Sequence, residues 1–441
     1  MPLFLFLLHL FPSYTSSEGI LYSDWDKLMT CHPLTYTLPS TEDQIISHIH
    51  SSKYNNETLK IVGAGHSFSG IQLTDGNMIS LDRYNRILKT TYMSTGEALV
   101  EVQAGIRLRD LNDQLEAMNL AIENLGATAA QSLAGAISTG THGTGAALGS
   151  ISTQIKSMRV IDSDGMIHIA SDEDDAELLA AARAGLGAVG VISTLTLRTV
   201  PLFRMRKTQV SYDLSALLQD LPDLLNTYDR LQWWFTPYTS DATLLTREVT
   251  TDSISPAAGG QAGCWSSLPT AASECVDVSY KTMVDSIDHY EDRDLYTEME
   301  MFIPVEYTQA AVLDFIAFQE SVKDKHDPDV ELFTGVRYVA ADDILLSPLY
   351  RRNSSVISFI VIGDKDKTGS TQEFEMYSRG LEAICEEKYE GRAHWGKVNY
   401  MNADIVRTSY GKNYDRFMEV KKRMDPNNMF TNDYLMERLG L

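Results

Sequence analysis

Two glycine-rich segments constrain the fold more than any other feature, because each must turn sharply or let the backbone pass close to another group. Residues 61–70 (Ile-Val-Gly-Ala-Gly-His-Ser-Phe-Ser-Gly) follow the apolar run 59–62, which predicts a short strand. Residues 132–145 are dense in Gly, Ser and Thr and contain no Asp, Glu, Lys or Arg. Backbone N–H groups in such loops can cradle phosphate oxygens. The two segments therefore predict a site for a flat, polar, anionic ligand, although the second alone also fits a small-residue packing loop.

A third segment, residues 185–190 (Gly-Leu-Gly-Ala-Val-Gly), matches the GxGxxG pattern of dinucleotide-binding folds. That pattern needs a strand before it and a helix after it, so that the helix N-terminus meets the pyrophosphate. Here a helical stretch over residues 172–184 precedes the glycines, and a β-branched run over residues 191–200 follows them. The reversed order argues against a nicotinamide dehydrogenase built on this segment.

Strand-like and helix-like stretches alternate without a regular βαβ rhythm, which predicts an α+β fold. The predicted strands are residues 59–62, 98–103, 191–200, 231–235 and 356–362, and the predicted helices lie near residues 108–118, 172–184, 214–228, 307–323 and 371–388. Residues 250–275 are rich in Ser, Ala, Gly and Pro and predict an exposed loop.

A length of 441 residues exceeds one typical core and predicts more than one domain. The character of the sequence changes at Pro201, so we expect domains at residues 18–200 and 201–395, with residues 396–441 packing back on the first. Residues 1–17 are apolar and then polar, which indicates a cleaved signal or targeting segment too short to span a bilayer. No Lys or Arg precedes the apolar run, so an N-terminal extension is the alternative.

The formal net charge of −23 repels phosphate backbones, so no nucleic-acid partner is expected. No Cys or His spacing is typical of a zinc site, and no metal is expected. No other apolar run is long enough for a membrane helix, so no stable membrane span is expected either.

Three features bear on the compartment. Asn56 and Asn353 open N-glycosylation sequons. Cys264 and Cys275 flank a loop-like stretch, so they predict either a local disulfide in an oxidising compartment or two free thiols. With the N-terminal segment, these features indicate secretion or the lumen of the secretory pathway or an organelle; a cytoplasmic location is the alternative if that segment is not a signal.

Several short motifs, in order along the chain, carry a family resemblance. They are residues 63–68, 73–79, 132–145 with their Ser-Thr-Gly-Thr-His-Gly-Thr-Gly core, 185–192, 233–237 (Trp-Trp-Phe-Thr-Pro), 336–348, 394–397 (His-Trp-Gly-Lys) and 425–435. With them the chain resembles the aldonolactone and alditol oxidases, which include the sugar-1,4-lactone oxidases and belong to the vanillyl-alcohol-oxidase-type flavoproteins. The resemblance runs from about residue 25 to residue 441.

The resemblance implies a PCMH-type FAD-binding domain followed by a substrate domain built on an antiparallel sheet flanked by helices. It also implies FAD bound covalently through His66, whose imidazole must be neutral and held against the flavin edge. His142 is expected beside the flavin rather than on it. The other residues implied to contact FAD are Ile61, Val62, Gly63, Ala64, Gly65, Ser67, Ser132, Ile137, Gly140, Thr144, Gly145, Ala146, Ala147, Gly190, Val191, Ile192 and His394.

On the substrate side, the resemblance implies catalytic roles for Arg337, Lys397 and Ser132. Oxidation of an alcohol delivers a hydride to the flavin and releases the hydroxyl proton. A cation near the oxygen stabilises the charge that develops on it, which is the role that the resemblance gives to Arg337 and Lys397. Trp233 and Trp395 are expected in the core rather than as platforms for a sugar.

One position departs from the family pattern. The family usually has a glutamate two residues before this arginine, and here that position is Gly335. In a strand, Glu331 would share the face of Gly335 but lie about 13 Å away, and Asp342 would face the other way. Neither residue replaces the carboxylate along the strand, so the usual lactone or polyol substrate is in doubt and a bulkier or anionic sugar derivative becomes conceivable.

The sequence therefore predicts an FAD-dependent oxidoreductase that oxidises a CH–OH group of a sugar lactone, polyol or related sugar derivative. Oxygen is the expected acceptor and hydrogen peroxide the expected product. The alternatives are a dehydrogenase of the same family that uses another acceptor, and a non-catalytic protein that binds flavin or sugar.

Overall fold

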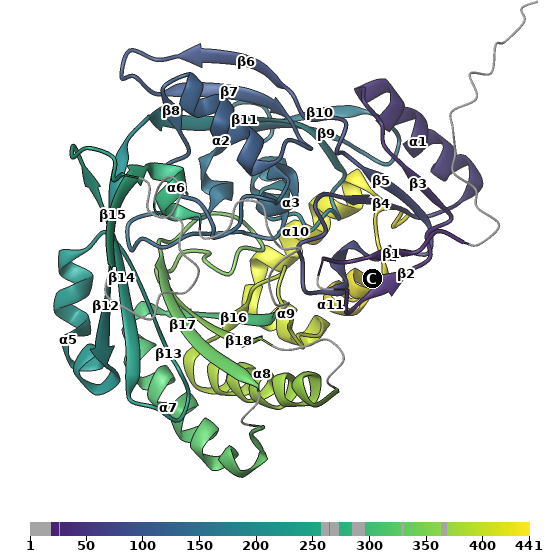
Figure 1. The fold of residues 1–441 in the computed structure, drawn as a ribbon. Helices are drawn as coiled ribbons and strands as arrows, with labels where there is room; N and C mark the ends of the chain where they lie inside the picture. Colours follow the sequence, from purple (N-terminus) through teal and green to yellow (C-terminus); the bar gives the residue numbers. More distant parts are fainter. Residues whose placement is uncertain are drawn as a thin grey trace, which may run out of the picture.

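The computed structural model describes residues 19–25, 27–256, 264, 273–284, 296–327, 330–362 and 368–441, so the predicted signal segment lies outside the described residues. Within these residues the chain forms two large sheets and two small ones, with helices packed around them (Figure 1). This mixture of antiparallel sheet and helix confirms the predicted α+β class.

The glycine-rich loop that carries His66 begins at the end of a short parallel strand. The strands β3 (Thr35–Thr37) and β4 (Leu59–Val62) both pair in parallel with β5 (Asn77–Ser80). The helix α1 (Glu42–Asn55) makes the crossover from β3 to β4, and β1 (Tyr22–Ser23) pairs with β2 (Thr30–Cys31) beside them. β4 is the strand predicted at residues 59–62.

A second group of strands forms a sheet in the order β10-β9-β11-β7-β6, with β8 paired to the end of β11. Its strands are β6 (Ile87–Tyr92), β7 (Ala98–Gln103), β8 (Leu120–Ala121), β9 (Ile155–Ile161), β10 (Ile167–Ser171) and β11 (Val191–Pro201). The associated helices are α2 (Leu108–Ala117), α3 (Leu133–Ser138) and α4 (Ala176–Ala182), with 3-10 turns η1 (Gly70–Gln72) and η2 (Ile151–Gln154). α4 is shorter than the helix predicted at 172–184, because Asp175 caps its start by accepting a hydrogen bond from the Leu178 N–H (2.9 Å).

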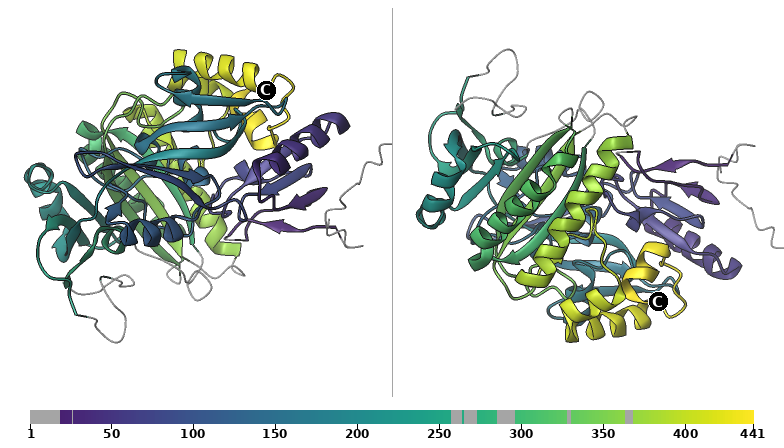
Figure 2. Two further views of the ribbon diagram at one scale, coloured as in Figure 1. Left: turned by 90° about the horizontal axis from the view of Figure 1, so that it is seen from above. Right: turned by 90° about the horizontal axis from the view of Figure 1, so that it is seen from below.

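The larger sheet is antiparallel and has the order β15-β12-β14-β13-β17-β18-β16-β19. Its strands are β12 (Arg204–Asp213), β13 (Arg230–Phe235), β14 (Asp241–Thr250), β15 (Ser273–Val278), β16 (Tyr296–Pro304), β17 (Glu331–Val339), β18 (Ser354–Ile362) and β19 (Arg392–Ala393). The helices of this part are α5 (Leu214–Thr227), α6 (Ser279–Met283), α7 (Thr308–Ser321) and α8 (Thr368–Tyr389), with 3-10 turns η3 (Val305–Tyr307) and η4 (Lys323–Lys325). α7 and α8 lie side by side over the sheet (Figure 2), which leaves its other face for the glycine-rich loops.

The loop predicted at residues 250–275 ends earlier than expected. Its last residues belong to β15, which pairs with β12, and Cys275 of that strand forms a disulfide with Cys264. Of this segment, residues 257–263 and 265–272 lie outside the described part of the chain.

The last helices are α9 (Ala403–Tyr410), α10 (Lys412–Met424) and α11 (Asp433–Leu439). α9 packs against the other two, which contact the first part of the chain. α10 packs against α4, where Arg416 forms an ion pair with Glu177 (2.7 Å), and α11 contacts η1. The Leu59 N–H at the start of β4 donates to the carbonyl of Met429 (2.9 Å). The C-terminal residues therefore support the strand that precedes the glycine-rich loop.

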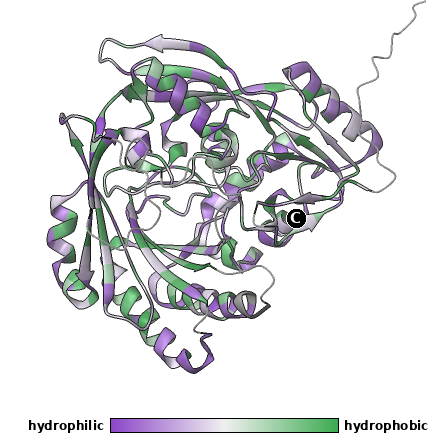
Figure 3. Cartoon of the chain, in the orientation of Figure 1, coloured by the Kyte–Doolittle hydropathy of each residue, from purple (hydrophilic) through white to green (hydrophobic). Residues whose placement is uncertain are grey.

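Hydrophobic residues run along the strands of the two large sheets, and hydrophilic residues appear on the peripheral helices (Figure 3). Trp233 and Trp395 are fully buried, and each indole N–H donates a hydrogen bond: Trp233 to the Tyr338 hydroxyl and Trp395 to the Leu346 carbonyl. Among the helices that the structure describes, none combines the length and the apolar character needed to cross a bilayer.

Candidate flavin and substrate site

A cavity of about 860 Å³, counting its open mouth, lies where the predicted glycine-rich loops meet. Three stretches line the cavity: residues 60–67 in β4 and after it, residues 131–139 around α3, and residues 186–192 before and at the start of β11. Segments far apart in the sequence thus converge on one site.

Two glycines make this convergence possible. A Cβ on Gly63 would lie 2.0 Å from the Ser132 Oγ, so only glycine lets the first loop approach α3 this closely. Gly190 has φ +121° and lies against the Ile161 carbonyl, where a Cβ would be 2.6 Å from the oxygen. Both positions expose backbone toward the cavity, as a phosphate-binding cradle requires.

The structure brings most of the predicted cofactor residues to the cavity wall and places the others elsewhere. The predicted residues on the wall are Ile61, Val62, Gly63, Ala64, Gly65, His66, Ser67, Ser132, Gly190, Val191 and Ile192. Ile137 is buried in α3, and Gly140 follows that helix with φ +79°. Ala146 and Ala147 are exposed and do not line the cavity.

His66 is half-buried within an aromatic group. Its ring centroid lies 5.7 Å from that of Trp25, which in turn contacts Phe68 and Tyr296. Burial, together with the positive charges of Arg107 and Lys397, lowers the pKa of His66 to about 4. The imidazole is therefore neutral at pH 7, as a nucleophilic nitrogen must be.

Sequence reasoning missed several residues of the wall, of which Lys60 is the most informative. Lys60 is 3% exposed, and its Nζ donates to the Phe430 carbonyl over a long 3.5 Å. Burial lowers its pKa to about 7, against the opposing charge of Asp425. Lys60 lies in a strand between two apolar residues, and nothing in that pattern indicates a role in ligand binding. Its position at the cavity wall, beside the glycine-rich loop after β4, is visible only in the structure.

The two predicted substrate-side cations are each paired with a buried glutamate of β16. Lys397 donates to Glu298, and its Nζ lies 4.7 Å from the centre of the ring of Phe68, two residues after His66. The Arg337 Nη1 donates to the Glu300 Oε1 at 3.0 Å. Sequence reasoning did not identify either glutamate.

Two histidines complete the surroundings of Glu300. His142 Nε2 lies 3.5 Å and His394 Nε2 3.9 Å from the Glu300 Oε2. The Gly143 carbonyl can only accept, so His142 Nδ1 donates to it (2.8 Å) and carries a proton. The Gly396 N–H can only donate, so His394 Nδ1 accepts from it (2.9 Å) and the ring proton of His394 is on Nε2. His142 Nε2 and Glu300 then face each other favourably only with a proton between them.

The charges in this group decide its protonation. Burial acts to raise the pKa of Glu300, but Lys397 and the hydrogen bond from His142 hold it well below the usual range. Burial raises the pKa of Glu298, against the lowering effect of Lys397. Burial also lowers the pKa of His394 to about 3, so this ring is neutral. Ligand atoms of His142, Glu300 and His394 lie within 4.8 Å of one another, but the adjacent Arg337 and Lys397 oppose a metal cation there.

The loop of residues 142–145 joins the flavin-side segment to β17. Gly145 N–H donates to the Tyr338 carbonyl (2.6 Å), and the Thr144 hydroxyl donates to the Leu231 carbonyl. Thr144 and Arg337 also line a second, smaller cavity, in which Arg230 lies as well. The predicted residues Thr144 and Gly145 are thus placed beside Arg337.

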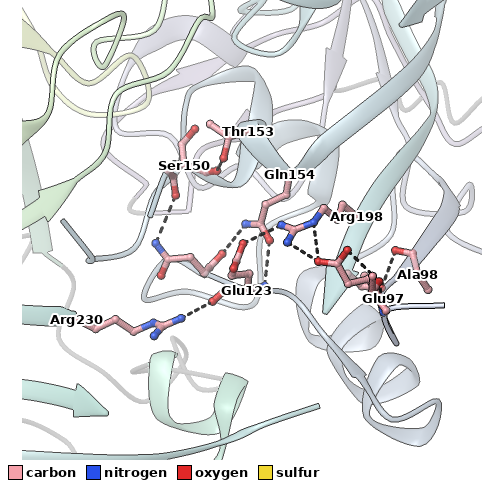
Figure 4. A network of polar contacts seen from close by, with 12 residues as sticks. Glu97, Ala98, Glu123, Ser150, Thr153, Gln154, Arg198 and Arg230 are labelled. Atoms are coloured by element: carbon pink, nitrogen blue, oxygen red, sulfur yellow. Dashed lines mark hydrogen bonds and ion pairs between the residues drawn. The ribbon is translucent and has the colours of Figure 1, made fainter. Parts of the chain in front are cut away.

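A polar network fixes the same junction from its other side (Figure 4). Arg230 of β13 donates to the Glu123 carbonyl (3.0 Å). The carboxylate of Glu123 accepts from Arg198 of β11 (3.0 Å). The backbone N–H of Glu123 donates to the side-chain oxygen of Gln154. This network links Arg230 of the large sheet to β11, whose first residues line the cavity.

These features fit an FAD molecule. The cavity wall offers glycine-rich backbone in which a Cβ would clash, a neutral imidazole beside aromatic rings, and a buried lysine at the phosphate loop. The residues that would hold the cofactor are those of the loop after β4, the start of α3 and the start of β11.

Comparison with known proteins gives the same assignment for both halves of the chain. A family model described as an FAD binding domain matches residues 33–171, and a model described as D-arabinono-1,4-lactone oxidase matches residues 266–438. An L-gulono-1,4-lactone dehydrogenase of Mycobacterium tuberculosis is 32% identical over 443 residues, covering 95% of this chain and 99% of the relative. A mouse L-gulonolactone oxidase is 29% identical, with 95% and 98% covered.

Solved structures share the fold at low sequence identity. Cholesterol oxidase from B. sterolicum has a TM-score of 0.78 at 15% identity, covering 95% of this chain and 96% of that one. Glucooligosaccharide oxidase from Acremonium strictum, described with a 6-S-cysteinyl, 8 alpha-N1-histidyl FAD, has a TM-score of 0.74 at 15% identity, with 94% of each chain covered. The fold, the cavity and the relatives together show that the chain belongs to the aldonolactone oxidoreductase family of FAD-binding flavoproteins.

Proposed function

We propose that this protein oxidises a CH–OH group of a sugar 1,4-lactone, or of a closely related sugar derivative, with FAD as the hydride acceptor. The observation that carries the proposal is that the cofactor cavity and the paired cations lie next to each other. The loop with His66 lines the cofactor cavity, and Phe68 of that loop lies against Lys397 of the paired cations. The names of the relatives, lactone dehydrogenase and lactone oxidase, support the substrate class.

FAD, when bound, accepts the hydride from the substrate carbon. The residues of this chain would bind the substrate and manage charge on its oxygen. Lys397 and Arg337 are held as cations by Glu298 and Glu300, so they are placed to stabilise negative charge as the hydroxyl loses its proton. Ser132, at the start of α3, would face the same ligand from the cavity wall.

The test of the proposal is anaerobic mixing of the purified yellow protein with L-gulono-, L-galactono- and D-arabinono-1,4-lactone, followed by absorbance of the flavin. We expect bleaching by at least one lactone, and Lys397→Met to slow it about 10²- to 10³-fold. A flavin that no lactone, polyol or sugar acid bleaches would instead support the non-catalytic alternative.

We further propose that the flavin is attached covalently to His66. The neutral imidazole and its aromatic surroundings support this, and the glucooligosaccharide oxidase of the same fold is described with a histidyl-linked FAD. Acid precipitation should leave a yellow pellet, with the mass of FAD on the His66 peptide. The variant His66→Ala should release all its flavin into the supernatant while still binding FAD through the other walls of the cavity; a yellow His66→Ala pellet would contradict the attachment site.

The acceptor that we propose is oxygen, reduced to hydrogen peroxide, because the relatives include enzymes named oxidases. One relative is named a dehydrogenase, so another acceptor is the alternative. After anaerobic reduction, mixing with buffer containing air should reoxidise the flavin within a catalytic turnover and form one peroxide per lactone. Reoxidation only by an added dye or quinone would show a dehydrogenase.

A secretory or organelle-lumen location is also proposed. The Cys264–Cys275 disulfide and the exposed Asn56 and Asn353 support it. Expression in a eukaryotic host, with a glycosidase-sensitive shift in mass that Asn56→Gln and Asn353→Gln remove, would test it. Protein without glycans in the cytoplasm of that host would contradict it.

A further inference from the structure

The strand β17 carries Arg337 but has no carboxylate at Gly335, two residues earlier on the same face. A Cβ at position 335 would lie 2.7 Å from the Ser358 Oγ. The Ser358 hydroxyl would therefore have to turn away to admit a side chain there. If Arg337 is to be held in place by an acid, that acid must come from another element.

The sheet register provides one. Gly335 pairs with Ser358 of β18, and Ser358 pairs with Glu300 of β16. Directly paired residues of antiparallel strands point to the same face, so these three form one row across the sheet. Strands lie about 4.8 Å apart, which puts Glu300 about 10 Å from Gly335. Only the small side chain of Ser358 lies between them in this row, and the Arg337 guanidinium reaches Glu300 across it, with its Nη1 3.0 Å from the Glu300 Oε1.

Glu300 is itself fixed by other segments. Its second carboxylate oxygen faces His142, from the loop after α3, and His394, from the loop after β19. Glu298, two residues earlier on the same face, holds Lys397. The carboxylate is 2% exposed, so it does not reach a ligand directly, whereas the Arg337 side chain is 23% exposed.

We propose that Glu300 supplies, from two strands away, the carboxylate that position 335 lacks, and that it positions the Arg337 guanidinium against the substrate oxygen. This inference rests on the proposed oxidation of a lactone. Glu300 acts through Arg337 and is therefore a positioning residue. A guanidinium that is already oriented needs no reorganisation when charge develops on the substrate, and misplacement of such a group by about 1 Å can cost 10²-fold in rate.

A double-mutant cycle tests the proposal. The variants are Glu300→Gln, Arg337→Ala and the two combined, with Glu300→Asp as the conservative variant and the exposed Glu331→Gln on β17 as a matched control. The measurements are the flavin content, the lactone dissociation constant and the rate constant of flavin reduction. We expect Glu300→Gln to lower the rate constant about 10²-fold. Glu300→Asp should recover most of this loss, and Glu331→Gln should match the unmodified protein. In the Arg337→Ala background, Glu300→Gln should cost no more than threefold further, because the group that it positions is already absent.

Additive losses would overturn the proposal, because they would show that Glu300 acts independently of Arg337. A second measurement covers poor folding of the Gln variant: guanidinium at low, non-denaturing concentration should restore reduction in Arg337→Ala but not when Glu300→Gln is also present. Equal restoration in both would also overturn it. If no lactone reduces the unmodified protein, the proposed function fails. The coupling between Glu300 and Arg337 is then measured with the same variants from their free energies of unfolding. Additive changes in these free energies would overturn the positioning role itself.

Discussion

At the scale of single residues, the site depends on buried charges that have partners. Glu298, Glu300 and Lys60 are all nearly inaccessible to water, and each would be costly to bury alone. Each of the two glutamates is paired with a cation, whereas Lys60 has one long hydrogen bond and a carboxylate near enough to raise its pKa. Lys60 is therefore the buried charge whose stabilisation depends most on what fills the cavity.

Lys60→Met should stabilise the flavin-free protein at pH 7 and weaken flavin binding. The folded-state pKa of about 7 lies below the ordinary value of 10.5, so the unfolded chain binds more protons between these pH values. Stability of the unmodified protein should thus rise with pH through this window, by about 5 kcal/mol in all, and the rise should vanish in Lys60→Met. Urea unfolding at several pH values, in flavin-free His66→Ala protein, measures this.

The exposed Lys53→Met on α1 is the control and should leave the pH dependence unchanged. The flavin dissociation constant of the same proteins completes the test. A Lys60→Met protein that binds flavin as tightly as its parent would show that the ammonium group does not contact the cofactor.

At the scale of elements, the side chain of Asn432 holds the end of the loop that carries His66, although it comes from a distant part of the sequence. The Asn432 side-chain amide donates to the carbonyls of Gly70 (2.9 Å), Ile71 (3.3 Å) and Leu73 (2.8 Å). Its oxygen meanwhile caps α11 by accepting from the Leu435 N–H (3.1 Å). One asparagine therefore orders η1 and starts a helix.

Asn432→Ala should lower the free energy of unfolding by about 2–4 kcal/mol, from the lost cap and the lost donor. Asn432→Asp keeps the capping oxygen and loses the donor, so it should retain helix α11 but still loosen the loop. Urea denaturation and flavin content measure the two effects. Equal stability of Asn432→Ala and the unmodified protein would refute the role of this contact.

The elements that could be predicted are those with local patterns. The strands at residues 59–62, 98–103, 191–200, 231–235 and 356–362 have runs of apolar or β-branched residues, and all are present. β16 was not predicted, because Glu298 and Glu300 at alternate positions look like a solvent-facing edge. Their burial depends on Arg337, 37 residues further on, and on histidines from two other segments. As expected, neither Glu331 nor Asp342 replaces the carboxylate at position 335, because Glu331 is exposed and Asp342 lies beyond the strand. The carboxylate that contacts Arg337 comes from across the sheet, which no pattern along β17 could indicate.

At the scale of the whole molecule, the two parts of the chain interlock. The loop of residues 142–145 is bonded to β17, Arg230 reaches Glu123, and the Phe68 N–H donates to the Gly396 carbonyl (2.8 Å). The length and the change of character at Pro201 predicted two domains but gave no information on how closely they join. That depends on backbone contacts between loops, which leave no pattern in the sequence.

This interlocking predicts a single cooperative unfolding transition. Calorimetry, near-UV circular dichroism and flavin fluorescence should give coincident midpoints. Arg230→Met, which removes the bond to Glu123 without changing size greatly, should lower the shared midpoint rather than split it. Two separate transitions in the unmodified protein would show that the parts are independently stable.

The contact of Asn432 with the loop at residues 70–73 has a consequence for the order in which the protein is made. These partners are about 360 residues apart, so the ribosome releases the glycine-rich loop long before the asparagine that orders it exists. During most of synthesis the loop with His66 lacks its hydrogen bonds from Asn432. The strand β4 likewise lacks its hydrogen bond to the carbonyl of Met429. The proposed attachment of the flavin to His66 would then occur on the finished chain rather than on the nascent one, and stalled nascent chains that stop short of residue 425 should carry no cofactor.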